Sequence, residues 1–185
     1  MWKSSCAAIF LAIAVITVLL RLHSVDEPFE RDLTTYSYTA HRLLAGDNLY
    51  TDVWDHKPPG IYGTYMLAET LWGYEPETVV YLGITFTLVS LLFLFLFLKE
   101  IAGPLTALAG CSFWALASNS IMLHGNLPNT ELFINSFTMV ALWSFARSRG
   151  ENNGYLFLSG LSLVVASTFK TLVLFPFAAF CLYLA

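Results

Sequence analysis

The feature that most restricts what this chain can fold into is a set of long apolar runs without a charged side chain. The clearest of them is residues 79–98, which ends in LLFLFLFL. A helix needs about 20 predominantly apolar residues to cross the hydrocarbon core of a bilayer. Of the 185 residues, 57% are apolar and 12% are charged, whereas ordinary soluble domains have about 45–50% and about 25%. This composition excludes soluble globular, disordered, coiled-coil and disulfide-framework proteins, and it favours a polytopic membrane protein.

Six apolar segments are candidate membrane spans, so we expect an all-α polytopic fold. They are residues 4–22, 79–98, 101–123, 130–147, 153–169 and 171–185. The first segment is either a cleaved signal peptide or an uncleaved anchor, and the missing small-x-small site after Leu20 favours the anchor. The last segment reaches Ala185 without a polar flank, so we expect the chain to be the N-terminal part of a longer protein.

The charged residues are concentrated in one segment. Residues 23–78 contain ten acids and three bases, a net charge of −7, whereas the rest of the chain carries +3. Lys and Arg are enriched in the cytoplasmic loops of membrane proteins. A cytoplasmic N-terminus places Lys3, Lys99, Arg147 and Arg149 on that side. The segment 124–131 and Lys170 then lie outside, and Arg21 fits this orientation poorly because it lies at the outer end of the first segment. We therefore expect residues 23–78 to form a large extracytoplasmic loop.

This acidic loop is predicted to contain two short helices. Residues 31–45 have apolar side chains at helical spacing and are followed by Gly46, a typical residue just beyond a helix end. The second helix is expected to start at Pro58-Pro59 and to stop at Gly73. Short amphipathic helices with Tyr and Trp are typical of the membrane interface. The residues alone leave two interpretations open, a pair of interfacial anchors or a functional site.

Four segments resemble the opening half of a known family of membrane enzymes. They are FERDLTTYSY, LLAGDNLYTDVWDHKPPGIYGTY, PNTELF and ASTFK. Together they resemble the GT-C superfamily of polyprenyl-phosphate-sugar glycosyltransferases, in the branch of the protein O-mannosyltransferases, the lipid A aminoarabinose transferase and the Rgt-type lipopolysaccharide-core transferases. The resemblance implies a GT-C helix bundle with interfacial helices in the first extracytoplasmic loop. It also implies a multi-pass protein of the bacterial inner membrane, active in protein or lipopolysaccharide glycosylation.

The implied reaction moves a sugar from a polyprenyl phosphate to an acceptor at the extracytoplasmic face of the membrane, with inversion. Such a site needs a carboxylate that accepts the proton of the acceptor, and donors that hold the departing phosphate. Asp32 is the candidate catalytic base, and its alternative role is that of an acid stabilised at a helix N-terminus. Lys57 is the candidate phosphate ligand, because the free N–H groups of the following helix start would face the same anion. Its alternative is a lysine that snorkels at the interface.

Five further residues complete the predicted site. His56 and Lys170 are further candidate phosphate contacts, and Glu30, Arg31 and Glu131 are candidate contacts to the acceptor or the sugar. The alternative for His56, a single histidine close to a loop Trp, is a structural role. Lys170 lies between two apolar runs, and a charged residue in or near a membrane-spanning segment usually has a functional role. Glu131 has an ordinary alternative as a first-turn acid, in a helix that Asn129 would cap.

We expect neither a resident metal nor another cofactor. Many relatives place a second acid soon after the loop aspartate, but here Leu33 and Thr35 follow Asp32, which leaves one carboxylate. A divalent metal is therefore compatible with the family but not supported by this sequence. The chain has no P-loop, no GxGxxG, no Cys/His cluster and no basic-aromatic stripe, and we expect no nucleic-acid partner.

Two other functions stay open, a polytopic transporter subunit and a non-catalytic scaffold that binds lipid. The polarity of this chain lies in one outer loop and no internal repeat is visible, which disfavours a transporter. The expected partners are a polyprenyl-phosphate-linked sugar, the bilayer and an acceptor of open identity, whether protein, lipid A or cell-wall glycan. The sugar and the carrier, undecaprenyl or dolichyl, are also open. We expect the 185-residue chain to be inactive when isolated from the rest of the enzyme.

Overall fold

The structure, a computed structural model, describes residues 2–22, 25, 27–120, 127–149, 152–173, 175, 178–179 and 181–182. Within these residues the regular secondary structure is helical, without a β-strand, as the sequence predicts. The helices are α1 (Trp2–Leu22), α2 (Arg31–Leu44), α3 (Gly60–Trp72), α4 (Pro76–Ala102), α5 (Pro104–Ala117), α6 (Thr130–Ser148) and α7 (Asn153–Ser167), followed by a 3-10 turn, η3 (Thr171–Val173).

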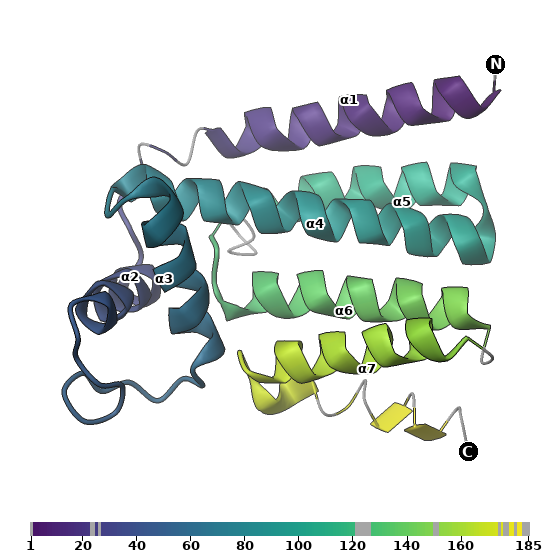
Figure 1. Ribbon diagram of the computed structural model, residues 1–185. Coiled ribbons are helices and arrows are strands. Elements are labelled where there is room, and N and C mark those ends of the chain that lie inside the picture. The colour runs from purple at the N-terminus through teal and green to yellow at the C-terminus, as the bar shows by residue number, and fades with distance from the viewer. Residues whose placement is uncertain are drawn as a thin grey trace.

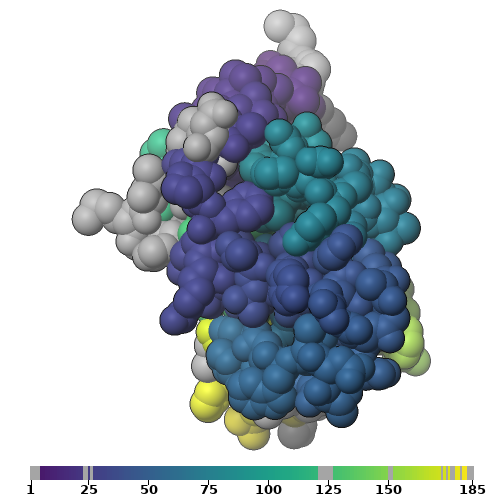
Figure 2. Space-filling view, turned by 90° about the vertical axis from the view of Figure 1, so that its left-hand side faces the viewer, coloured from purple at the N-terminus to yellow at the C-terminus, as the bar shows by residue number. Residues whose placement is uncertain are grey.

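Five of these helices run side by side, and the two short helices of the acidic loop lie across one end of them (Figure 1). Helix α1 packs on α4 and α5, α4 packs on α5 and α6, and α7 packs on α6. Helix α2 packs on α3, which in turn contacts α4. The space-filling view of this end shows the surface of α2, of the following loop and of α3 over much of the face (Figure 2). The acidic loop therefore forms a folded layer over the end of the bundle.

Two helices in the described part of the chain are long and apolar enough to cross a membrane. They are the Ser5–Leu22 part of α1, with a mean hydropathy of 2.4, and α4, in which an 18-residue stretch has a mean hydropathy of 2.5. Helices α5 and α7 are also apolar, but they have only 14 and 15 residues. Length and composition therefore give two candidate spans, of which the first lies near the N-terminus, where a signal sequence passes the same test.

The helix boundaries differ from the apolar runs in the sequence, and Gly103 is the main reason. Helix α4 continues to Ala102, Gly103 turns the chain with a φ of 85°, and Pro104 occupies the first position of α5. Proline is favoured there because its missing N–H would have no helical partner. The uncharged run 101–123 is thus divided between two helices, and α5 ends at Ala117. Residues 121–126 lie outside the described residues, as does part of the sixth predicted span, 171–185.

The two helices of the acidic loop are where the apolar spacing predicts them. Helix α2 ends at Leu44 and is followed by Gly46 with a φ of 104°, and α3 ends at Trp72 and is followed by Gly73 with a φ of 89°. Helix α3 begins at Gly60, one position later than the expected proline start. The buried residues of the two helices are Leu33, Tyr36, Thr39 and Ala40 in α2, and Ile61, Tyr62, Tyr65 and Ala68 in α3.

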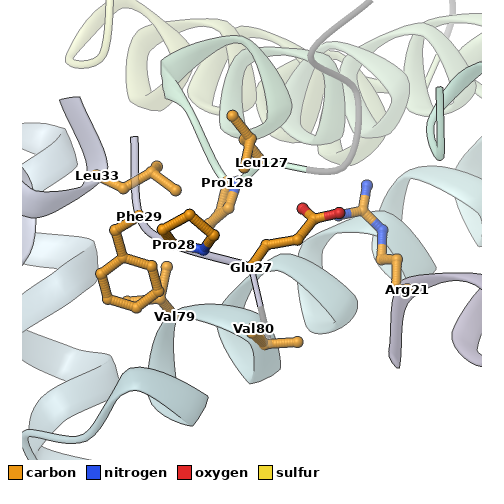
Figure 3. A pocket seen from close by; sticks show the side chains of 9 residues that line it. All are labelled: Arg21, Glu27, Pro28, Phe29, Leu33, Val79, Val80, Leu127 and Pro128. Atoms are coloured by element: carbon orange, nitrogen blue, oxygen red, sulfur yellow. The ribbon is translucent and has the colours of Figure 1, made fainter. Parts of the chain in front are cut away.

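The single charge that fits the expected topology poorly, Arg21, is buried in the fold. Its side chain is 2% exposed, and its Nη2 donates a hydrogen bond of 2.9 Å to the carbonyl oxygen of Ser118, just beyond α5. Figure 3 shows the pocket beside it, where the carboxylate of Glu27 points toward the guanidinium group. Arg21 thus ties the end of α1 to the end of α5 inside the protein.

Candidate functional site

A row of packed aromatic side chains holds α2 and α3 against the ends of α6 and α7. The ring of Tyr36 lies 6.2 Å from that of Tyr62 and 5.8 Å from that of Tyr65, in T-shaped arrangements. Tyr65 contacts Phe133 in α6, and Phe133 stacks on Phe169, just after α7, at 5.2 Å. All five rings are buried. They fix the polar groups at the surface of the two short helices relative to the bundle.

Asp32 and Lys57, the two central residues of the predicted site, lie together on this frame. The Nζ atom of Lys57 is 3.9 Å from Oδ2 of Asp32, and the same oxygen accepts a 3.3 Å hydrogen bond from the Tyr36 hydroxyl one helical turn away. The side chains of Asp32 and Lys57 are 32% and 16% exposed. Arg31 points mostly into solvent, with its Nη2 at 3.5 Å from Oδ1 of Asp32. The aspartate therefore has a positive neighbour on each side and remains open to solvent.

The loop between α2 and α3 positions Lys57 through its own hydrogen bonds. The backbone N–H and the side-chain amide of Asn48 both donate to Oδ2 of Asp52, at 2.8 and 2.9 Å. These bonds lower the pKa of Asp52. Tyr50, which has a φ of 72°, donates its hydroxyl to the carbonyl oxygen of Lys57 at 2.7 Å. The backbone of Lys57 is therefore held directly.

Asp55 anchors the same loop to α3 and also pairs with His56. Its carboxylate accepts hydrogen bonds from the Tyr62 hydroxyl at 2.6 Å and from the backbone N–H of His56 at 2.7 Å. Burial alone would raise the pKa of Asp55, but these bonds outweigh it and hold the pKa below its usual value. The ring of His56 pairs with Asp55 at 2.9 Å and is 72% exposed. In this arrangement His56 supports Asp55.

The phenols of Tyr36 and Tyr62 connect the acids of the site. Burial raises the pKa of Tyr36, and the negative charges of Asp32, Asp55 and Glu131 raise it further. Burial and the hydrogen bond to Asp55 likewise raise the pKa of Tyr62. Both phenols therefore stay protonated and act as hydrogen-bond donors. The Tyr36 hydroxyl bonds to Asp32, and that of Tyr62 bonds to Asp55.

Glu131 and Lys170, the two predicted site residues outside the acidic loop, form a second pair at this end. Oε1 of Glu131 is 2.6 Å from Nζ of Lys170, and Oε2 accepts a 3.0 Å hydrogen bond from Thr130. The backbone N–H of Gly60, at the start of α3, donates to the carbonyl oxygen of Thr168 at 3.0 Å. This bond holds the segment that carries Lys170 against the segment that carries Lys57.

Glu30 points away from Asp32, toward α6. Its Oε2 accepts a 3.2 Å hydrogen bond from the side-chain amide of Asn129. Asn129 does precede α6, as expected for a capping residue, but its side chain makes no capping hydrogen bond. The amide instead joins the start of α2 to the start of α6.

The sequence analysis missed Tyr36, Asp55 and Tyr62 as members of this cluster. Tyr36 stands four positions after Asp32, a spacing that places both side chains on one face of a helix and that the sequence does contain. The bond between Asp55 and Tyr62 has no such signal, because a loop and a helix start separate them. The described residues contain no group of three His, Cys, Asp or Glu side chains that could hold a metal ion.

The resulting site offers a solvent-accessible carboxylate beside an ammonium group, with a second acid–base pair on the adjoining helix ends. A carboxylate can accept a proton, and an ammonium group can bind an anion such as a phosphate.

No protein family, curated protein or solved structure matches this chain.

Proposed function

We propose that this chain is part of a membrane glycosyltransferase that moves a sugar from a polyprenyl-phosphate donor to an acceptor at the extracytoplasmic membrane face, with inversion. The observation that supports this function best is the pairing of Asp32 and Lys57 at 3.9 Å on a partly exposed surface. The pair lies at the end of a helix bundle in which α1 and α4 are long and apolar enough to cross a membrane. A lipid-linked phosphate needs a site of this kind at the height of the headgroups.

The geometry of the pair leaves both groups available. Charged N–H···O hydrogen bonds are about 2.7–2.9 Å long, so the 3.9 Å separation of Lys57 and Asp32 is not a closed ion pair. Glu131 and Lys170, at 2.6 Å, are closed onto each other. Lys57 is therefore the first candidate for the donor phosphate, whereas Lys170 must leave Glu131 before it can bind an anion.

In the proposed reaction an acceptor hydroxyl or amine attacks the anomeric carbon of the donor. The bond between that carbon and the phosphate oxygen breaks, and its electron pair leaves with the polyprenyl phosphate. Asp32 takes the proton of the acceptor, and Lys57 holds the charge that grows on the departing phosphate. Attack from the face opposite the phosphate inverts the anomeric centre. The proposed roles of Glu30, Arg31 and Glu131 are contacts to the sugar or the acceptor.

The proposed placement in the membrane follows the charge distribution. The N-terminus lies in the cytoplasm, α2 and α3 lie at the outer interface, and the shorter apolar helices complete a multi-pass bundle in a bacterial inner membrane. The exposed pair of Arg147 and Glu100, at 3.1 Å, would then face the cytoplasm.

The test is a donor assay with labelled polyprenyl-phosphate sugars on the complete protein. Asp32→Asn keeps the acceptor atom for Tyr36 but removes the basic carboxylate. We expect kcat to fall by about 10²–10⁴ with little change in donor affinity. Lys57→Ala should weaken donor binding and also slow transfer, since the loss of a charged hydrogen bond costs about 1.5–3 kcal/mol.

Glu30→Gln is the matched control, because glutamine can still accept the hydrogen bond from Asn129. If Asp32 acts alone as the base, this variant should lower turnover far less than Asp32→Asn does. Near-normal turnover of Asp32→Asn would refute the catalytic assignment and leave Asp32 as a helix-terminal acid. A large loss in Glu30→Gln would show that two acids share the reaction.

A further inference from the structure

A groove lies on the flank of α2 that faces away from Asp32. It is lined by Phe29, Thr34, Ser37, Tyr74, Glu75 and Pro76. With 3.6 residues per helical turn, Thr34 and Asp32 point in directions about 200° apart. The groove therefore lies between α2 and the turn that joins α3 to α4, separate from the pair of Asp32 and Lys57.

Three polar side chains of this groove have no hydrogen-bond or ion-pair partner within the described residues. The hydroxyl groups of Ser37 and Tyr74 and the carboxylate of Glu75 make no hydrogen bond and no ion pair with any residue that the structure describes. Glu75 precedes α4, and its side chain makes no capping bond there. The hydroxyl of Thr34 donates to the carbonyl oxygen of Glu30 at 3.2 Å, and its oxygen can still accept. The groove thus presents two hydroxyl donors and several acceptors to a ligand.

The aromatic wall of the groove is held in place before any ligand binds. The ring of Tyr74 stacks on that of His41, with 4.0 Å between the centroids and an angle of 18° between the planes. Nδ1 of His41 lies 2.7 Å from Oε1 of Glu69 in α3, which fixes the histidine. Phe29, which also lines the groove, packs against the core. Rigid side chains lose little conformational entropy on binding.

The lining selects a class of ligand. Two aromatic side chains supply apolar lining, and the hydroxyl groups and the carboxylate offer hydrogen bonds. No Lys or Arg lines the groove and Glu75 is negative, so a phosphate or another anion would be repelled. A ring with apolar C–H faces and many hydroxyl groups fits both features.

We propose that this groove binds a carbohydrate chain and prefers amino sugars, whose ammonium group the carboxylate of Glu75 attracts. The binding needs no donor phosphate and no transfer step, so it can be measured whether or not the chain is a transferase.

The test measures affinity for two probes, the tetramer of glucosamine and the tetramer of N-acetylglucosamine. The complete chain is placed in phosphatidylcholine nanodiscs at pH 6, without a lipid-phosphate donor, and titrated by calorimetry. The charged tetramer should bind about tenfold more tightly, since a charged hydrogen bond exceeds a neutral one by roughly 1–1.5 kcal/mol. Glu75→Gln should remove this difference. Glu77 is an exposed acid near the start of α4 that does not line the groove, so Glu77→Gln should leave the difference in affinity unchanged.

Two further variants test the neutral contacts. Tyr74→Ala should lower the affinity for both probes by roughly tenfold. Ser37→Ala should lower it by roughly two- to tenfold. Asp32→Asn should bind both probes like the unchanged protein, which separates this groove from the proposed reaction. Absence of binding, or affinities that Tyr74→Ala and Ser37→Ala leave unchanged, would overturn the proposal. Competition by ethanolamine as strong as by the glucosamine tetramer would show recognition of an amine alone and would also overturn it.

Discussion

Gly60 is the position at which a single methyl group should disturb the site most directly. A Cβ built there would lie 2.2 Å from Oγ1, 2.8 Å from the carbonyl oxygen and 2.9 Å from the carbonyl carbon of Thr168. Two of these atoms belong to the backbone, which cannot rotate away as a side chain can. Gly60→Ala must therefore push α3 away from the end of α7. It would also stretch the 3.0 Å hydrogen bond between Gly60 N and Thr168 O.

The cost can be worked out from these contacts. Overpacking costs about 1–3 kcal/mol, and the weakened hydrogen bond about 0.5–1.5 kcal/mol. The higher helix propensity of alanine offsets this cost by about 0.5–1 kcal/mol of folding free energy. The expected net loss of unfolding free energy is about 2 kcal/mol. For a chain of this length the melting temperature should fall by roughly 4–8 °C.

Gly63→Ala is the matched control in the same helix. A Cβ at Gly63 meets nothing within 4 Å, so only the gain in helix propensity remains. This variant should melt about 1–4 °C higher. The assay is thermal unfolding followed by intrinsic fluorescence in one membrane mimetic for all variants.

The double variant with Thr168→Ala sharpens the test. Removing Oγ1 relieves the 2.2 Å clash but leaves both backbone contacts, so the stability should recover only in part. If Gly60→Ala and Gly63→Ala raised the melting temperature equally, α3 and the end of α7 would not be in contact, and the reasoning would be refuted.

Two further predictions concern Asp55 and the topology. Because the folded pKa of Asp55 lies below its unfolded value, its contribution to stability is present above about pH 4 and is lost as the pH falls through the folded pKa. Tyr62→Phe removes one stabilising bond, so its melting temperature should lie below that of the unchanged protein at neutral pH, and the gap should narrow in acid. In a cysteine-free background, Asn48→Cys should react with impermeant reagents from the outside and Arg149→Cys from the cytoplasm. Labelling of position 48 from the cytoplasm alone would reverse the proposed orientation.

The sequence predicts well those parts of the structure that depend on residues close to one another in the chain. The apolar spacing within residues 31–45 and after Pro59 determines which faces of α2 and α3 are buried, and Gly46 and Gly73 mark where the helices end. Asp32 stands in the first turn of α2 and Lys57 precedes α3, so the packing of α2 on α3 brings the two side chains to 3.9 Å.

The parts that the sequence does not reveal depend on contacts between distant segments. Nothing near Asn129 in the sequence shows that its amide would bond to Glu30 and leave the helix end uncapped. The closed pair of Glu131 and Lys170 likewise depends on how α6 and α7 pack. The sequence also does not reveal that α4 continues past Lys99 and Glu100 and ends at Ala102, because the uncharged run that starts at residue 101 continues through Gly103 into α5.

The hydrogen bond from Gly60 to Thr168 also has a consequence for the order in which the protein folds. It joins residues 108 positions apart, whereas 25 positions separate Asp32 from Lys57. Closing the longer loop costs about 1.3 kcal/mol more in chain entropy, and it must wait until residue 168 has left the ribosome. The pair of Asp32 and Lys57 can thus form early during synthesis, while the second acid–base pair is added only when the last described helix docks. A ribosome-bound chain stopped shortly before Thr168 would carry the first half of the site without the second.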